Sequence, residues 1–303
     1  MAVSTKVIKQ KIKSVGNIKK ITKTMEMVSV SKMRKAVDKT LSSRIYALYA
    51  LELLMNISKD KEIKHPFMIK GKNENTELLI IVTSNKGLCG GYHTNIFKAL
   101  NSYLIKNKEK KIKVITVGKN AEKMCRKTSL EVFASFNNFS ENSSIDQTED
   151  LSRLLMKEYK DGSYSSAKIL YTEFVKSTNY KPALKQIFPL SVESVKNLLD
   201  VDTGEMDTLG KFEGDLKNYL FEPSLTTILN NVLPGLIDSI VYQALSESFA
   251  SEHSARMFAM KNAGDNAATI LDSLMLSYNH ARQDNITKEL AEIVGGAEAL
   301  KVD

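Results

Sequence analysis

The chain has 303 residues and a formal net charge of +8, and 26% of its residues are charged. No run approaches the roughly 18 to 20 apolar residues of a membrane helix, so we expect a soluble chain without direct membrane insertion. With 5 Pro, 14 Gly and no Trp, the composition favours long helices over an all-β fold with many turns.

Positive charge is concentrated at the start of the chain. Residues 1–40 contain eleven Lys and Arg side chains but only two acidic ones, Glu26 and Asp38, so their net charge is +9. The rest of the chain sums to −1. Such a local excess indicates an acidic partner, which can be nucleic acid, anionic lipid or an acidic protein surface.

A single long helix is predicted from residue 4 to about residue 58, within an N-terminal region of 1–60. This stretch has no Pro and only Gly16, and its apolar residues recur mostly every three or four positions. At about 1.5 Å per residue, such a helix would extend roughly 80 Å, well beyond a small domain. We therefore expect it to protrude.

Residues 77–190 predict a Rossmann-like α/β domain. Short apolar runs at 78–82, 113–117 and 169–175 are typical of buried strands, and helices are expected at 92–107, from 118 to about 127, and at 146–160. Strands that alternate with helices at this spacing favour a mostly parallel sheet. We count the run at 169–175 as the third strand.

A second long helical pattern begins at Pro223 and continues to the end of the chain, residues 223–303. Pro is well placed in a first turn, whereas Pro234 should kink the helix or mark a join between two helices. Small residues at Ala263, Gly264, Ala267 and Ala268 would permit close approach of another backbone.

The two long helices are expected to pack on each other, because an α/β domain of this size cannot cover both apolar stripes. The fold class is therefore α/β plus a long antiparallel coiled coil, with the terminal helices flanking the α/β domain.

No catalytic, metal or cofactor site can be assigned from the residues. The sequence SNKGLCGG follows a predicted strand and precedes a helix, as phosphate-binding loops do, but it matches no nucleotide-binding motif, so a tight turn is the favoured interpretation. His65, His93, His253 and His280 show no metal-binding spacing. Cys89 and Cys125 form no disulfide framework, which indicates a reducing compartment.

Three blocks of the sequence resemble the gamma subunits of F-type ATP synthases. They are SVGNIKKITKTMEMVSVSKMRKA (14–36), TSNKGLCGGYHTNIF (83–97) and SEHSARMFAMKNAGDNA…YNHARQDNITKELAEIVGGAEAL (251–300), and they occur in the family's order. Asn85, Lys86, Thr24 and Lys288 depart mildly from the family's pattern. The resemblance implies a non-catalytic rotor shaft that couples ion-driven rotation of the c ring to ATP synthesis or hydrolysis on beta subunits.

The resemblance also implies partners and a location. The shaft would lie inside a ring of three alpha and three beta subunits, and the α/β domain would touch the epsilon subunit and the c-subunit ring. The expected location is peripheral, on the cytoplasmic face of a bacterial plasma membrane, since the N-terminal sequence shows no transit segment. No added Cys pair occurs at 190–222, so cysteine-based regulation is not expected.

Residues that match the family's contact motifs would meet the beta subunit. From KITKTM and ARQDNIT these are Lys20, Ile21, Thr22, Lys23, Met25, Arg282, Gln283 and Thr287. Arg282 and Gln283 would form a hydrogen-bonding catch, and AEIVGGAEAL would occupy an apolar sleeve of the ring.

Two other function classes stay open from the residues alone. A coiled-coil protein that binds nucleic acid would fit the basic N-terminal segment, although that segment has no interleaved aromatic residues. An enzyme is the third possibility. Steep salt dependence of DNA binding would indicate the nucleic-acid-binding protein. Nucleotide binding by the isolated chain would indicate the enzyme.

Overall fold

The computed structural model describes residues 5–57, 65–199 and 224–299. The chain divides into two compact units, Met1–Ser29 with Arg256–Asp303, and Val30–Ala255. We call them the tip unit and the body unit. The helices α1 (Thr5–Ile57) and α7 (Leu225–Ala299) each run from one unit into the other.

The two long helices agree with the sequence patterns, with one correction. The start expected at Pro223 lies outside the described residues. A join at Pro234 is wrong, because α7 continues through it as one helix. Leu233, Leu236 and Ile237 beside it are each at most 1% exposed. Packing on both sides of the proline thus outweighs the loss of one backbone hydrogen bond.

The body unit contains a five-stranded sheet in the order β3-β2-β1-β4-β5. Its strands are β1 (Thr76–Val82), β2 (Lys111–Val117), β3 (Glu131–Phe136), β4 (Ser166–Lys176) and β5 (Asn179–Phe188). The pairs β1–β2, β1–β4 and β2–β3 are parallel, and β4–β5 is antiparallel. The mostly parallel sheet is therefore confirmed.

The sequence patterns do not predict the strands β3 and β5. The run at 169–175 therefore belongs to the fourth strand and not to the third. Both β3 and β5 are edge strands, and most of their side chains are partly or fully exposed. Edge strands carry polar residues and Pro that discourage further pairing, here Lys181, Pro182 and Lys185 on β5. They therefore lack the continuous apolar run by which the central strands were recognised.

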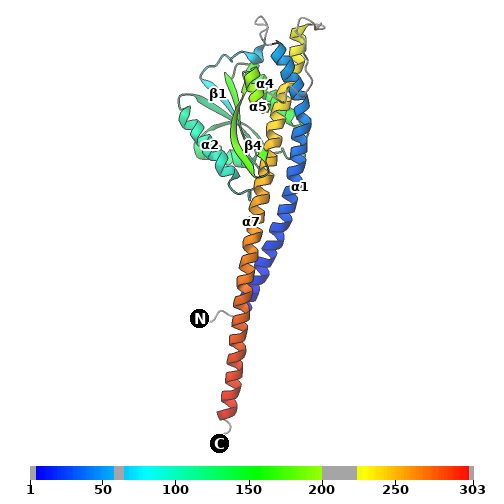
Figure 1. The fold of residues 1–303 in the computed structure, drawn as a ribbon. Helices are drawn as coiled ribbons and strands as arrows, with labels where there is room; N and C mark the ends of the chain where they lie inside the picture. Colours follow the sequence, from blue (N-terminus) through cyan, green and yellow to red (C-terminus); the bar gives the residue numbers. More distant parts are fainter. Residues whose placement is uncertain (1–4, 58–64, 200–223, 300–303) are drawn as a thin grey trace. The chain divides into compact units, whose positions relative to one another are not determined.

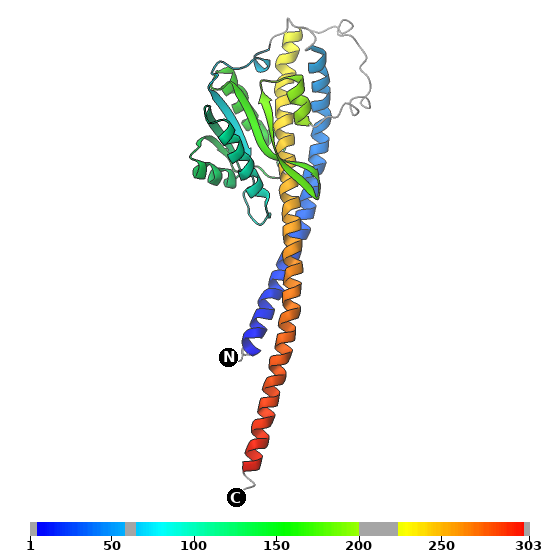
Figure 2. The ribbon, with the colours of Figure 1, turned by 60° about the vertical axis from the view of Figure 1, so that its left-hand side comes forward.

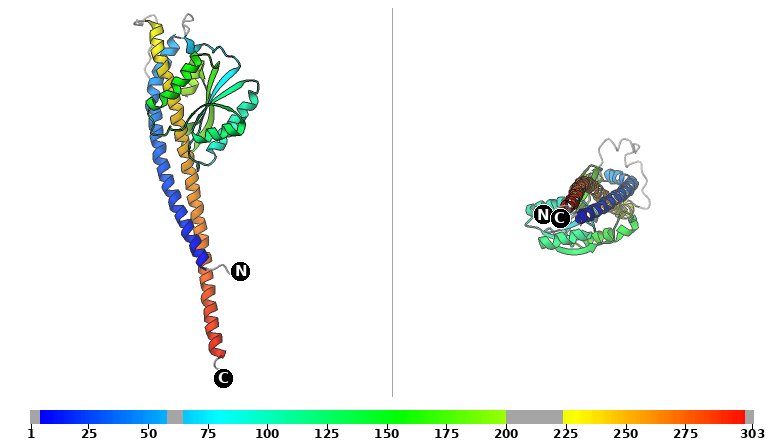
Figure 3. Two further views of the ribbon diagram at one scale, coloured as in Figure 1. Left: turned by 180° about the vertical axis from the view of Figure 1, so that it is seen from behind. Right: turned by 90° about the horizontal axis from the view of Figure 1, so that it is seen from below.

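Helices cover both faces of the sheet. They are α2 (Tyr92–Lys106), α3 (Lys119–Thr128), α4 (Ile145–Lys160) and α5 (Val192–Leu199), and a short 3-10 helix, η1 (Pro66–Met68), precedes β1. Along β1, Leu78, Ile80 and Val82 face a core shared with α1, α4, α5 and α7. Leu79 and Ile81 face a second core shared with α2 and α3. The left view of Figure 3 shows, from behind, the helices on both sides of the sheet.

Within each unit, α1 and α7 run side by side in opposite directions (Figures 1 and 2). In the body unit, Gly235 of α7 faces the Tyr46 ring of α1. In the tip unit, Gly264 faces Thr22, and Ala267 is 4% exposed. The expected close approach at the small residues is therefore present, and the fold class is confirmed.

Candidate functional site

The N-terminal residues named from the sequence do not all face the same way. In the tip unit, Lys20, Ile21 and Lys23 are exposed and Met25 is half-buried. Thr22 is only 7% exposed, and its hydroxyl donates to the carbonyl oxygens of its own helix. Thr22 therefore packs between α1 and α7, where its side chain is not available to another molecule.

Apolar and cationic groups alternate on the outer face of this part of α1. Ile18, Ile21 and Val28 are each about half exposed, at spacings of three and seven residues that keep them on one face. Beside them, the Lys23 ammonium pairs with the Glu26 carboxylate at 3.0 Å. A helix face with apolar residues framed by charges is typical of a protein interface.

The C-terminal residues named from the sequence are all exposed. Arg282, Gln283 and Thr287 lie on α7, and the Thr287 hydroxyl donates to the Gln283 carbonyl oxygen at 3.0 Å. Among the described residues, no carboxylate lies within 4 Å of the Arg282 guanidinium. Its five N–H donors are therefore available to a partner that offers acceptors.

The end of α7 is exposed all round in the tip unit. From Arg282 to residue 297 every described side chain is exposed. Several of these side chains are large and apolar, and their exposed fractions reach 57% for Leu290, 68% for Ile293 and 61% for Val294. A cluster of large exposed apolar side chains is typical of a surface for protein interaction.

The glycine-rich turn after β1 uses its polar groups internally. Asn85 donates through Nδ2 to the Asn137 carbonyl oxygen at 2.9 Å and accepts from the Lys119 backbone N–H at 3.0 Å. Leu88 and Gly90 have positive φ angles of 62° and 55°. The motif therefore forms a tight turn that joins β1 to the ends of β2 and β3, which fits the favoured interpretation.

The histidines are placed apart, and three of them contact polar groups inside the body unit. His65 lies 3.1 Å from Asn230 Oδ1, His93 lies 2.8 Å from Ser84 Oγ, and His253 contacts Glu141. His280 is exposed on α7. Among the described residues, no group of three His, Cys, Asp or Glu side chains could hold a metal ion.

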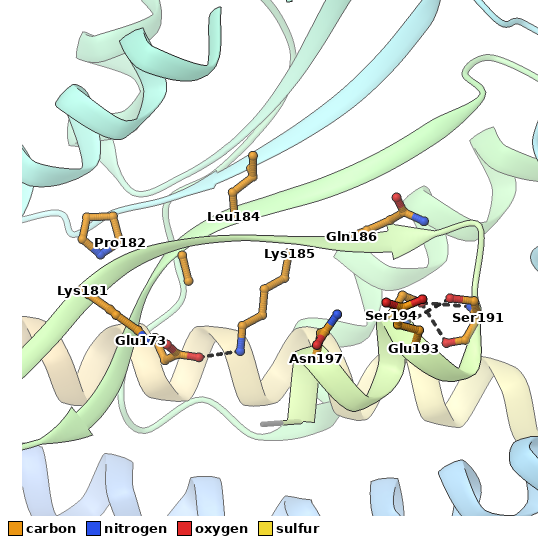
Figure 4. Close-up of a pocket in the computed structure, with 11 residues that line it drawn as sticks. Glu173, Lys181, Pro182, Leu184, Lys185, Gln186, Ser191, Glu193, Ser194 and Asn197 are labelled. Carbon is orange, nitrogen blue, oxygen red and sulfur yellow. Dashed lines mark hydrogen bonds and ion pairs between the residues drawn. The ribbon is translucent and has the colours of Figure 1, made fainter. Parts of the chain in front are cut away.

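The body unit has an open pocket of about 730 Å³ between β5 and α5 (Figure 4). Three of its charged groups are paired with each other, because Glu173 accepts from Lys185 and lies 3.3 Å from Lys181, whereas Glu193 of α5 is exposed. Burial raises the pKa of Glu173, but the hydrogen bonds and charges of the two lysines outweigh burial and lower it. Ser191 and Ser194 bond each other's backbone N–H, so they cap α5.

No described helix is both long enough and apolar enough to cross a bilayer.

Comparison with known proteins gives one consistent result. A family model described as "ATP synthase" matches residues 4–300. The ATP synthase gamma chain of Janthinobacterium sp. (strain Marseille) is 36% identical over 300 residues, covering 98% of this chain and 99% of the relative. The gamma chain of Variovorax paradoxus (strain S110) is 38% identical over 298 residues, covering 97% of each chain.

Solved structures share the fold at lower identity. A chain of the Euglena gracilis mitochondrial ATP synthase, in a structure of OSCP, F1 and c-ring, has a TM-score of 0.64 at 20% identity, covering 98% of this chain and 94% of that one. A chain from the Tetrahymena thermophila central stalk and c-ring has a TM-score of 0.57 at 23% identity, covering 80% and 99%.

Proposed function

The chain belongs to the family of ATP synthase gamma chains, and we propose that it is the rotating central shaft of an F-type ATP synthase with no catalytic site of its own. In this role it couples rotation of the c ring to ATP synthesis or hydrolysis on the beta subunits. The observation that carries the proposal is the exposed end of α7, where apolar side chains have no cover within the tip unit.

A ring of alpha and beta subunits would provide that cover. Helices in proteins gain most of their stability from packing, so a helix end with exposed Leu290, Ile293 and Val294 is suited to an apolar sleeve. Arg282 and Gln283, which precede this apolar end on α7, can donate to acceptors on beta. Thr287 lies one helical turn after Gln283. The N-terminal contact would use Lys20, Ile21, Lys23 and Met25, while Thr22 sets the spacing of the two helices.

The shaft acts by differential contact. If its exposed face bonds a beta subunit in some rotational positions and not in others, it favours a different beta conformation at each position. The energy available is bounded by these contacts, about 1.5 to 3 kcal/mol for a hydrogen bond to a charged group such as Arg282. Rotation of the c ring thus changes the populations of the three catalytic sites.

The α/β part of the body unit is proposed to bind the epsilon subunit and the c ring. This arrangement would put the chain at the cytoplasmic face of a bacterial plasma membrane as a peripheral subunit. The absence of catalysis is proposed because Asn85 of the glycine-rich turn and the Glu173–Lys185 pair of the pocket at β5 are engaged in internal hydrogen bonds and ion pairs.

Co-purification tests the assembly. A tagged copy of the chain, expressed in its own organism, should bring down alpha, beta and epsilon subunits and the c ring from solubilised membranes. Recovery of DNA with the tagged chain, and none of these subunits, would contradict the proposal.

Activity per assembled complex tests the catch. Arg282→Ala combined with Gln283→Ala should assemble normally but slow ATP hydrolysis and synthesis, by roughly 10- to 150-fold if one charged hydrogen bond is lost. Lys288→Ala with Glu289→Ala is the matched control, because both residues are exposed on the same helix. Equal turnover of the two double variants would remove Arg282 and Gln283 from the mechanism.

A further inference from the structure

One loop of the body unit contacts both long helices through polar groups. It comprises residues 137–144, between β3 and α4, and we call it the bracing loop. Its Glu141 is 8% exposed and lies between two basic side chains. The Lys32 ammonium of α1 is 2.7 Å from Glu141 Oε1, and His253 Nε2 of α7 is 3.4 Å from Oε2.

The same loop meets both helices at a second level. The Ser143 carbonyl oxygen accepts from Lys39 Nζ at 2.9 Å and from the Tyr242 hydroxyl at 3.2 Å. Lys32 and Lys39 are seven residues apart, two helical turns, so they share one face of α1. Tyr242 and His253 are eleven residues apart, three turns, on one face of α7. Each helix is therefore held at two levels by the same loop.

The bracing loop is itself fixed to the sheet. Phe139 is 5% exposed and stacks on Phe136 at the end of β3, with 5.5 Å between ring centroids. Asn137 accepts from Asn85 in the turn after β1 and donates to Glu122 of α3 at 3.0 Å. A load on the loop is thus passed to β3, to α3 and to the turn after β1.

Polar bonds of this kind add a directional restraint to the close packing of the core. The close-packed interior already resists movement of the two helices, but the hydrophobic effect itself has no preferred direction. A hydrogen bond weakens steeply once its angle departs from linearity. Bonds from two helices to one fixed loop therefore oppose twisting of either helix against the sheet.

We propose that Glu141 is a positioning residue for torque transfer, which locks α1 and α7 to the α/β part so that both helices turn with it. This inference rests on the proposed function as a rotor shaft. The helices α1 and α7 each continue from the body unit into the tip unit. A rotation imposed on them at Glu141 would therefore be carried along each helix to the residues proposed to meet beta.

A second buried carboxylate provides a matched control. Glu77 is 1% exposed and also lies between two lysines, 3.3 Å from Lys110 and 3.1 Å from Lys168. Its partners precede β2 and lie on β4, so among the described residues these ion pairs join the sheet to itself and involve neither long helix. Loss of Glu77 should weaken the fold without changing how the helices are held.

The test uses the assembled ATP synthase with Glu141→Leu, Glu141→Gln and Glu77→Gln. The angular spread of the stalled rotor is measured by single-molecule rotation, together with ATP hydrolysis with and without an opposing ion gradient. For Glu141→Leu we expect the angular variance of the link between the helices and the α/β part to rise, since one of the two levels at which the loop holds both helices is lost. Hydrolysis should slow only under load. Glu141→Gln, which keeps one acceptor, should show a smaller change.

A covalent bridge should reverse the effect. In the double variant Lys32→Cys with Glu141→Cys, a short reagent that links two thiols should restore the wild-type angular spread, whereas blocking each thiol separately should not. Cys89 and Cys125 are both buried and should react little in the folded protein.

The outcomes separate the inference from the proposed function. If Glu141→Leu and Glu77→Gln lose similar stability and both keep the wild-type angular spread, Glu141 is only structural and the inference is wrong. If the wild-type chain does not assemble with alpha, beta and the c ring, the proposed function itself fails.

Discussion

The Thr22 side chain of α1 lies against Gly264 of α7, so closely that a Cβ on Gly264 would be 3.3 Å from the Thr22 hydroxyl oxygen. The hydroxyl donates to the backbone of its own helix, to the Ile18 and Lys19 carbonyl oxygens at 3.0 Å. It is therefore held in place and has little freedom to move away. We expect the spacing of the two helices in the tip unit to depend on this contact.

Gly264→Leu should separate the helices in the tip unit. A branched side chain at this position overpacks the contact, which costs about 1–3 kcal/mol. Hydrogen exchange of the isolated chain should then be faster at residues 8–29. Gly295→Leu is the control, because a Cβ there meets no atom within 4 Å. Equal exchange in the two variants would show that Gly264 does not set the spacing.

Gly118→Ala should destabilise the body unit strongly. Gly118 has φ +87° and ψ +145°, a region that is essentially restricted to glycine, and a Cβ would lie 2.6 Å from the Thr83 carbonyl oxygen. Urea unfolding should show a loss of about 2–5 kcal/mol from strain and clash together.

Gly162→Ala separates these two causes. Gly162 also has a positive φ, +78°, but the nearest atoms to a Cβ are side-chain carbons of Lys72 at 3.8 Å or more. Only the backbone strain remains, about 1–2 kcal/mol. A loss as large as that of Gly118→Ala would contradict the steric part of the explanation.

Glu247→Gln should stabilise the chain at neutral pH. Burial raises the pKa of the Glu247 carboxyl, and the hydrogen bond from Gln243 only partly opposes this. A raised pKa means that the carboxyl's contribution is fully present below the unfolded value of about 4.3 and is lost as pH rises through the folded value. The variant should therefore gain stability over the wild type at about pH 7 and lose that advantage below about pH 4.

Glu141→Gln should show the opposite pH dependence. The hydrogen bond to His253 holds the pKa of Glu141 well below its usual range, burial opposes this, and the hydrogen bond from Lys32 reinforces it. A lowered pKa contributes stability above about pH 4.3, which is lost as pH falls through the folded value. Urea unfolding across pH should show the variant less stable than the wild type at neutral pH and equal to it in acid. A pH-independent difference would refute the assignment.

Cys125 should resist alkylation in the folded chain. Burial raises the pKa of its thiol to about 11, and the charge of Glu122 adds to the effect. Because the thiolate is the reactive form, maleimide should label Cys125 slowly at about pH 8 and rapidly once urea unfolds the chain. Peptide mapping by mass spectrometry measures both rates. Equal labelling with and without urea would show that Cys125 is accessible.

The end of α7 should change its protection on assembly. Residues 275–297 are mostly exposed in the tip unit, so their amides should exchange quickly in the isolated chain. In the assembled complex, cover by the ring should slow them, while residues 243–255, buried in the body unit, should exchange slowly in both states. Unchanged exchange at 275–297 would contradict the proposed sleeve.

Much of the architecture could be predicted from the sequence, because buried positions are apolar and recur at the spacing of a helix or a strand. The apolar residues of α1 and α7 recur at helical spacing, and the run Leu78–Val82 is apolar at every position because both faces of β1 are covered. The small residues near Gly264 indicated where the helices approach. The three sequence blocks identified the family, and with it the residues that are expected to meet beta.

Only the tertiary structure decided where polar groups meet. Lys32, Glu141 and His253 are each more than a hundred residues from the next, and no spacing rule connects them, because polar partners are set by how loops and helices come together in space. Sequence spacing also does not predict the edge strands β3 and β5, because their exposed faces need no apolar run. It does not predict the orientation of Thr22 either, since a hydroxyl that bonds its own helix can face solvent or the other helix until packing fixes it.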